Sequence, residues 1–158
     1  MVTIYSDGAS RGNPGPGGYG AVLLSGNLRK ELSEGFRLTT NNRMELLGVI
    51  AALEALKKEG TEVTVYSDSK YVVDSIEKKW VFGWEKKNFK DKKNPDLWMR
   101  FLNVYRKHKI KFIWVKGHHT NKENNRCDEL AVAAAQEKQL KIDTGYEIEL
   151  KKENTKLL

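Results

Sequence analysis

The chain has 158 residues, a formal net charge of +7 and a pI of about 9.4. This length predicts one domain with its own core, and no run approaches the roughly 20 apolar residues that a membrane-spanning helix needs. A single cysteine excludes an internal disulfide framework, so we expect a cytoplasmic monomer without membrane contact, and the basic excess favours a polyanionic partner.

The opening third of the sequence predicts an antiparallel meander. A β-branched strand covers residues 2–6, and the glycine- and proline-rich run over residues 7–18 predicts a loop. Two extended runs follow, over residues 19–26 and 31–38, and the Ser25-Gly26-Asn27 turn joins them.

Helical periodicity begins after the meander. Apolar residues at helical spacing predict a helix over residues 42–58 that stops at Gly60. A strand follows over residues 63–68, and a short helix begins near Ser69.

The last part of the chain continues the alternation of helices and strands. A helix opens at Asn94-Pro95, a strand covers residues 109–115, and a helix covers residues 121–140. Residues 147–158 predict a polar tail that frays from Lys151. The pattern predicts a mixed α/β sheet with helices on its faces.

Two strands carry nearly the same six residues, VTIYSD at 2–7 and VTVYSD at 63–68. Each ends on an aspartate, Asp7 or Asp68. Ligands collect at strand ends in open α/β sheets, so both aspartates are candidates for one site. The alternative is that each aspartate serves only as a turn or cap residue.

Two more acidic residues lie on the apolar faces of predicted helices. Glu45 opens the apolar stripe of its helix, although it is also placed to form a capping box with Asn42. Asp128 follows the apolar Cys127 and shares a face with Ala131. Inward carboxylates need a cation or hydrogen-bond donors, so Asp7, Glu45, Asp68 and Asp128 together predict a shared cation site.

The ligand types favour a hard cation. Carboxylates suit Mg²⁺ or Mn²⁺, whereas a structural zinc site needs closely spaced cysteines and histidines. The adjacent His118 and His119 and the lone Cys127 do not supply such a set. Two divalent ions about 3.5 to 4 Å apart would balance four carboxylates and hydrolyse a phosphodiester.

Four motifs, in this order, resemble one known family. They are DGASRGNPGPGG, TTNNRMEL, YSDSKYV and VKGHHTNKENNRCDELA. Together they closely resemble bacterial ribonuclease HI, of the type 1 ribonuclease H family, which cuts the RNA strand of RNA/DNA hybrids. The resemblance runs from Val2 to about Tyr146. It implies a ribonuclease H-like fold over residues 1–146, with three antiparallel and two parallel strands in one sheet and helices on both faces.

The resemblance also implies the chemistry. In the family the four acidic positions bind two Mg²⁺ ions, for which Mn²⁺ can substitute, and Asp7, Glu45, Asp68 and Asp128 occupy them here. His118, in the VKGH motif, would assist proton transfer or product departure. The expected reaction on an RNA/DNA hybrid leaves 3′-hydroxyl and 5′-phosphate ends.

The resemblance places substrate contacts in two polar turns and at one further position. Asn13, Asn41 and Asn42 would contact sugars and base edges, Thr40 would bind a DNA-strand phosphate, and Ser10 would help read the RNA. Short polar side chains suit the 2′-hydroxyl, which both donates and accepts hydrogen bonds. Lys70 stands where many bacterial members have glutamine, so we expect it to contact a phosphate.

Most of the excess charge lies in residues 78–93, which we call the handle. This segment has seven lysines, among them Lys86 and Lys87, against two acidic residues. Trp80 and Trp84 lie one helical turn apart within it, and the resemblance assigns the segment to the substrate-binding protrusion of the family, shortened by a few residues. The alternative is a solvated lysine face whose tryptophans pack inward.

Other functions fit the sequence less well. A non-catalytic hybrid-binding module would have lost part of the acidic set. A transposase-like nuclease would lack TTNNRMEL and the handle, and the nuclease domain of a reverse transcriptase would follow a polymerase. Cys127 as a nucleophile with His118 is disfavoured by its apolar neighbours.

Overall fold

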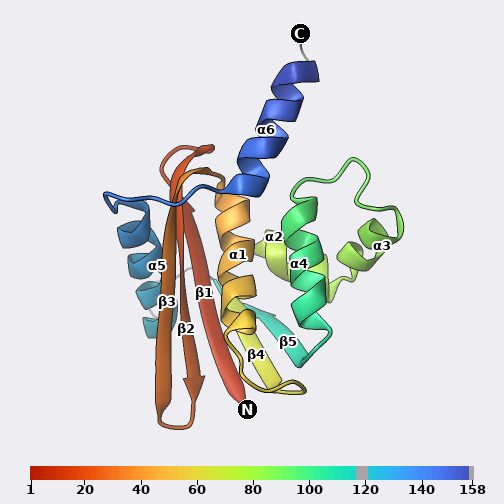
Figure 1. Ribbon diagram of the computed structural model, residues 1–158. Helices are drawn as coiled ribbons and strands as arrows, with labels where there is room; N and C mark the ends of the chain where they lie inside the picture. The colour runs from red at the N-terminus through yellow and green to blue at the C-terminus, as the bar shows by residue number, and fades with distance from the viewer. Residues whose placement is uncertain (117–120, 157–158) are drawn as a thin grey trace.

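A computed structural model describes residues 1–116 and 121–156 of the chain, and Figure 1 shows the order of its elements. In chain order these are β1 (Val2–Ser10), β2 (Gly15–Ser25), β3 (Leu28–Thr39), α1 (Asn41–Glu54), β4 (Glu62–Ser67), α2 (Lys70–Glu77), α3 (Trp80–Lys86), α4 (Pro95–Tyr105), β5 (Lys109–Trp114), α5 (Lys122–Ala135) and α6 (Thr144–Lys156). The strands form one sheet in the order β3-β2-β1-β4-β5.

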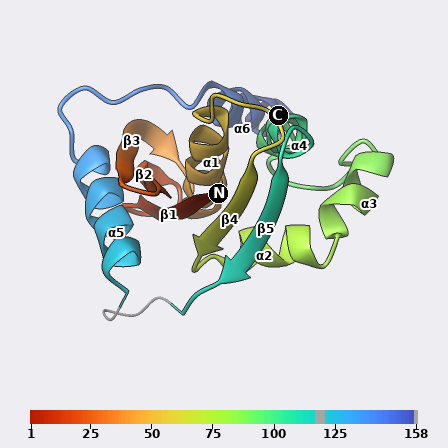
Figure 2. The same ribbon diagram turned by 90° about the horizontal axis from the view of Figure 1, so that it is seen from below.

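Helices cover both faces of this sheet. Strands β1, β2 and β3 pair antiparallel, whereas β4 pairs parallel with both β1 and β5. Helix α5 packs on the first three strands, and α1 and α4 lie on the opposite face (Figure 2). The predicted mixed sheet is confirmed. No helix within the described residues is long and apolar enough to cross a membrane.

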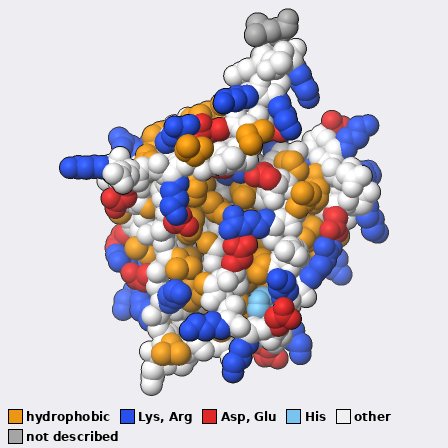
Figure 3. All heavy atoms as spheres, viewed as in Figure 1, with side chains coloured by type: hydrophobic (Ala, Val, Ile, Leu, Met, Phe, Trp, Pro, Cys, Tyr) orange, Lys and Arg blue, Asp and Glu red, His pale blue; other side chains and the backbone are white. Residues whose placement is uncertain are grey.

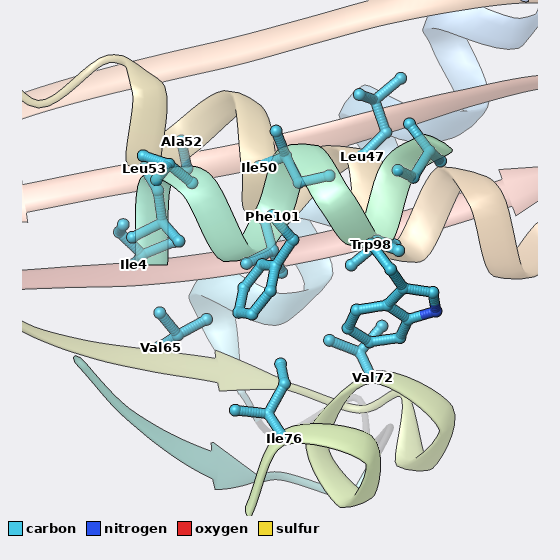
Figure 4. Close-up of a cluster of buried hydrophobic side chains, with 14 of the residues drawn as sticks. Ile4, Leu47, Ile50, Ala52, Leu53, Val65, Val72, Ile76, Trp98 and Phe101 are labelled. Atoms are coloured by element: carbon cyan, nitrogen blue, oxygen red, sulfur yellow. The ribbon is translucent and has the colours of Figure 1, made fainter. Parts of the chain in front are cut away.

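The core lies between the sheet and the helices α1, α2 and α4. Ile4, Ile50 and Val65 are fully buried there, and Trp98 and Phe101 of α4 fill the space above α2 (Figure 4). Full burial of one such aliphatic side chain contributes about 1.5–3 kcal/mol. This packing holds the ends of β1 and β4 beside the start of α1.

Glycines in the meander let a helix approach the sheet closely. A Cβ at Gly20 would lie 2.3 Å from the Cys127 carbonyl oxygen of α5, and one at Gly35 would lie 2.0 Å from the Ala134 carbonyl oxygen. Only a residue without a side chain fits these contacts.

The predicted loop over residues 7–18 is mostly strand. β1 continues to Ser10 and β2 begins at Gly15, with Ser10 paired to Gly17. The register of β2 against β3 shifts between Gly15 and Gly17, which accommodates Pro16 in the strand. Glycines in this run predict a loop, but in the folded protein they serve close packing.

The C-terminal ends of two helices and the structure of the polar tail also differ from the predictions. Helix α1 ends at Glu54, and α5 ends at Ala135 because the chain then hydrogen-bonds along β3: Lys141 N–H donates to the Gly35 carbonyl. The segment from Lys151, which we expected to fray, continues helix α6 to Lys156.

Candidate active site

Two parallel strands deliver the first two carboxylates. Ser6 of β1 pairs in register with Ser67 of β4, so Asp7 and Asp68 are the next residues on neighbouring strands. Asp7 still lies within β1, whereas Asp68 follows the end of β4. The repeated six residues of the sequence therefore place two carboxylates at equivalent positions, side by side.

Helix α1 brings Glu45 to the same point. The Gly8 N–H donates to Asp7 Oδ1 at 2.9 Å and to Glu45 Oε1 at 3.0 Å. A Cβ at Gly8 would lie 2.3 Å from the Glu45 backbone nitrogen, so a glycine is required where β1 touches α1. The alternative role of Glu45 as a capping-box partner of Asn42 is wrong, because Thr40 is the N-cap of α1.

Carboxylate oxygens of Asp7, Glu45 and Asp68 lie within 4.8 Å of one another. Asp7 and Glu45 are buried and Asp68 is partly buried. Glu45 Oε2 is buried and has no hydrogen-bond partner among the described residues. Oxygen ligands with a free buried carboxylate oxygen fit a hard divalent cation, so this cluster could hold a metal ion.

The cluster is electrostatically strained without a cation. Burial, and then repulsion from Asp68 and Asp128, raises the pKa of Asp7 to about 7, although hydrogen bonds from its neighbours oppose the shift. Burial, followed by the charge of Asp7, raises the pKa of Glu45 well above its ordinary value, and burial also raises the pKa of Asp68. The site therefore favours protons or a cation.

Asp128 does not point inward as we expected. It is exposed on α5, whose sheet-facing side is formed by Asn124, Cys127, Ala131 and Ala134. Its charge nevertheless contributes to the raised pKa of both Asp7 and Asp68, which places it at the rim of the cluster. His118 lies outside the described residues.

The two polar turns of the sequence meet at the start of α1. Thr40 caps the helix by accepting from the Arg43 N–H, and Asn13 Oδ1 accepts from the Asn41 N–H at 3.1 Å. A groove of 870 Å³ begins here and is lined by Asn13, Thr40 and Asn42. Ser10 is partly buried at the end of β1.

The handle and helix α6 line the rest of the same groove. Trp80 and Trp84 of α3 both line it. Trp84 packs edge-on against Trp98 with ring centroids 5.8 Å apart, whereas Trp80 is 48% exposed. Lys86 and Lys87 are exposed, and Figure 3 shows basic side chains along this side of the molecule (right). One tryptophan thus anchors the handle and the other faces solvent.

The family model described as RNase H matches residues 1–136. The chain belongs to the ribonuclease H family. A curated Ribonuclease H from Syntrophus aciditrophicus is 57% identical over 151 residues, covering 92% of this chain and 87% of the relative. A Ribonuclease HI from Synechocystis is 52% identical and covers 92% of each chain. The resemblance seen in the motifs and the expected enzyme class are confirmed.

Solved structures agree with this ribonuclease H assignment. LC9-RNase H1, described as a type 1 RNase H with the type 2 active-site motif, has a TM-score of 0.76 at 32% identity, covering 85% of this chain and 71% of that one. LC11-RNase H1, solved in complex with an RNA/DNA hybrid, has a TM-score of 0.65 at 28% identity and covers 85% and 96%.

The lone cysteine of this ribonuclease H is not a nucleophile. Cys127 is fully buried under the sheet, and burial raises the pKa of its thiol to about 12. A thiol that stays protonated and inaccessible at neutral pH cannot attack a phosphodiester.

Sequence reasoning missed a buried arginine inside a ribonuclease H motif. Arg43 is 2% exposed, and its guanidinium donates to Asp143 and to Asp96 at 2.7–2.9 Å and to Asn94 at 3.3 Å. Thr39 also donates to Asp143. The network fixes the start of α1, where the polar turns lie. Its partners are far away in sequence, so only the position of Arg43 on an otherwise buried helix could have indicated it.

Proposed function

We propose that this protein hydrolyses the RNA strand of RNA/DNA hybrids at the cluster of Asp7, Glu45 and Asp68, leaving 3′-hydroxyl and 5′-phosphate ends. The observation that carries the proposal is the approach of these three carboxylates to within 4.8 Å on a ribonuclease H fold. The cluster, completed at its rim by Asp128, would hold two Mg²⁺ ions, or Mn²⁺ in their place.

The residues of the cluster have separate tasks. Bound divalent ions would activate a water molecule and stabilise the leaving oxygen of the phosphodiester. The Gly8 N–H keeps Asp7 and Glu45 oriented, and Glu45 Oε2 remains free to act as a ligand. Preorganised ligands of this kind need little rearrangement when a cation binds. His118 would move a proton or aid product departure, as imidazole does near neutral pH.

The groove supplies the proposed substrate contacts. Asn13, Thr40 and Asn42 line one side and Trp80 and Trp84 the other, with Asn41 exposed beside them. Amide and hydroxyl groups suit the minor groove of a hybrid, where 2′-hydroxyls distinguish RNA from DNA. Ser10, Lys70, Lys86 and Lys87 would extend the contact to the RNA and to phosphates. The hybrid bound to LC11-RNase H1 supports this partner.

The whole protein would act as a cytoplasmic monomer. The rival function, a hybrid-binding module without catalysis, requires an incomplete acidic set, whereas all four acidic positions are filled. No feature of the described residues favours the rival.

A cleavage assay tests the proposal. A hybrid with labelled RNA should be cut in Mg²⁺ and spared in EDTA, while duplex DNA of the same sequence stays intact. Ligation and primer-extension assays on the fragments should report 5′-phosphate and 3′-hydroxyl ends. Absence of cleavage at millimolar Mg²⁺ would leave only the binding function.

The substitution Asp7→Asn should lower kcat by at least about a hundredfold, because it weakens a ligand without changing the packing. Hybrid binding in Ca²⁺ should persist, measured by fluorescence anisotropy. Asp74→Asn, a matched change on α2 whose carboxylate pairs with Lys78, should leave kcat unchanged. Near-normal turnover of the Asp7 variant would refute the assignment of the cluster.

A further inference from the structure

A lysine and a tryptophan are paired beside the carboxylate cluster. Lys70 is the first residue of α2, two positions after Asp68, and its Nζ lies 4.8 Å from the centroid of the Trp114 ring. Both residues are exposed, Trp114 by 40%. The pair therefore lies on the surface that a substrate of the cluster would approach.

Trp114 also contacts the backbone of the cluster. It is the last residue of β5, where it pairs in register with Ser67 of β4. Its indole Nε1 donates to the Asp68 carbonyl oxygen at 3.1 Å. One indole thus holds the Lys70 ammonium on its face and the Asp68 backbone on its edge, which fixes the position of the ammonium relative to the carboxylates.

This arrangement differs from an ordinary solvated lysine. An exposed lysine has many rotamers, and contact with an aromatic face restricts them. The ammonium keeps its charge and its remaining donors toward solvent, and a phosphate is the natural acceptor for such a point charge. When a phosphodiester of the RNA strand lies at the cluster, a neighbouring phosphate of that strand passes its rim.

We propose that Trp114 is a positioning residue that holds Lys70 on the RNA-strand phosphate next to the one being cut. The proposal rests on the proposed function, because it needs an RNA strand at the carboxylate cluster. It assigns a task to Trp114, and it gives Lys70 a defined place on the substrate.

Four variants test the pair: Lys70→Met, Trp114→Leu, the double variant, and Trp114→Phe, which keeps an aromatic face but loses the N–H. KM and kcat are measured on one hybrid at several salt concentrations. Lys70→Met and Trp114→Leu should each raise KM by about threefold or more. They should lower the magnitude of the slope of log binding constant against log salt by about one, with kcat changed by less than about twofold.

The KM of the double variant should be no higher than that of the more impaired single variant, because both substitutions remove the same contact. Trp114→Phe should keep the salt slope of the unmodified protein. Lys30→Met, a change at an exposed lysine on β3, is the matched control and should leave the slope unchanged. Thermal melting of each variant confirms that it is folded.

Several results would overturn the pairing. They are an unchanged salt slope in Lys70→Met, additive losses in the double variant, or a Trp114→Leu enzyme whose kcat falls while KM stays constant. The last result would show that Trp114 acts by holding the backbone of Asp68 and not by positioning Lys70. If the unmodified protein fails to cut the hybrid, the proposed function fails first, so the two failures are distinguishable.

Discussion

Asp7 and Glu45 accept hydrogen bonds from the same backbone N–H, so their buried carboxylates lie side by side and repel each other when both are ionised. The pKa of Asp7 is 3.8 in the unfolded chain and about 7 in the folded one. Between these values the folded protein binds more protons than the unfolded chain. The contribution of Asp7 to the free energy of unfolding without metal therefore falls as pH rises from about 4 to 7.

Mg²⁺ should stabilise the protein more at pH 8 than at pH 5. The cation competes with protons at the cluster, and it relieves repulsion only where the carboxylates are ionised. The measurement is the difference in Tm between Mg²⁺ and EDTA at each pH. Asp7→Asn should reduce the difference. An equal effect of Mg²⁺ at both values would place its binding elsewhere.

The buried Arg43 makes a separate prediction. Arg43→Met should lower the free energy of unfolding by about 3–5 kcal/mol, because it leaves the buried Asp143 carboxylate without its cation. Urea unfolding measures this. Arg37→Met is the matched control: it breaks the Arg37–Glu147 pair, whose arginine is 56% exposed, and should cost at most about 1 kcal/mol. Equal losses would mean that burial of Arg43 is not decisive.

Single residues were predicted unevenly from sequence. The repeated strands correctly placed Asp7 and Asp68 side by side, because in-register parallel pairing converts equal sequence into equal position. Asp128 was wrongly expected to point inward, since a position next to the buried Cys127 lies at the edge of the packed face. Arg43 was missed because Asp143, its buried partner, lies 100 residues away.

At the scale of elements, the handle combines a packed base with a charged outer surface. The double variant Lys86→Met/Lys87→Met should have a higher KM for a hybrid. The slope of its log binding constant against log salt should fall in magnitude by about one to two, which corresponds to the loss of one to two phosphate contacts. The adjacent, exposed pair Lys57 and Lys58, beyond the end of α1, gives a matched double control. An unchanged salt slope for the handle variant would assign these lysines to a solvated face.

The errors in element boundaries have one physical origin. Composition identified Gly8 and Gly18 as loop residues, but they are strand positions that α1 and α5 approach within contact of the backbone. Local sequence does not reveal which helix will pack there. Similarly, α5 ends early because Lys141 finds hydrogen-bond partners on β3. Strongly periodic helices such as α4 were predicted well.

At the scale of the whole molecule, the C-terminal segment stabilises the fold mainly through Asp143 and much less through helix α6. No residue within Thr144–Lys156 is buried, whereas Asp143 is 6% exposed. A chain ending at Glu147 should lose less than about 1 kcal/mol, because a short solvated helix is marginal by itself. A chain ending at Leu140 should lose about 3–5 kcal/mol. Urea titrations compare them, and equal stabilities would contradict the role of Asp143.

The pairing of Arg43 with Asp143 also determines which part of the chain becomes structured last during synthesis. Arg43 belongs to the first helix to be made, but its buried partner emerges 100 residues later. At about 5–20 residues per second, this interval lasts about 5–20 s. Throughout it, the polar turn beside α1 lacks its final support. A nascent chain should therefore acquire its sheet before the groove at the start of α1 becomes fully ordered.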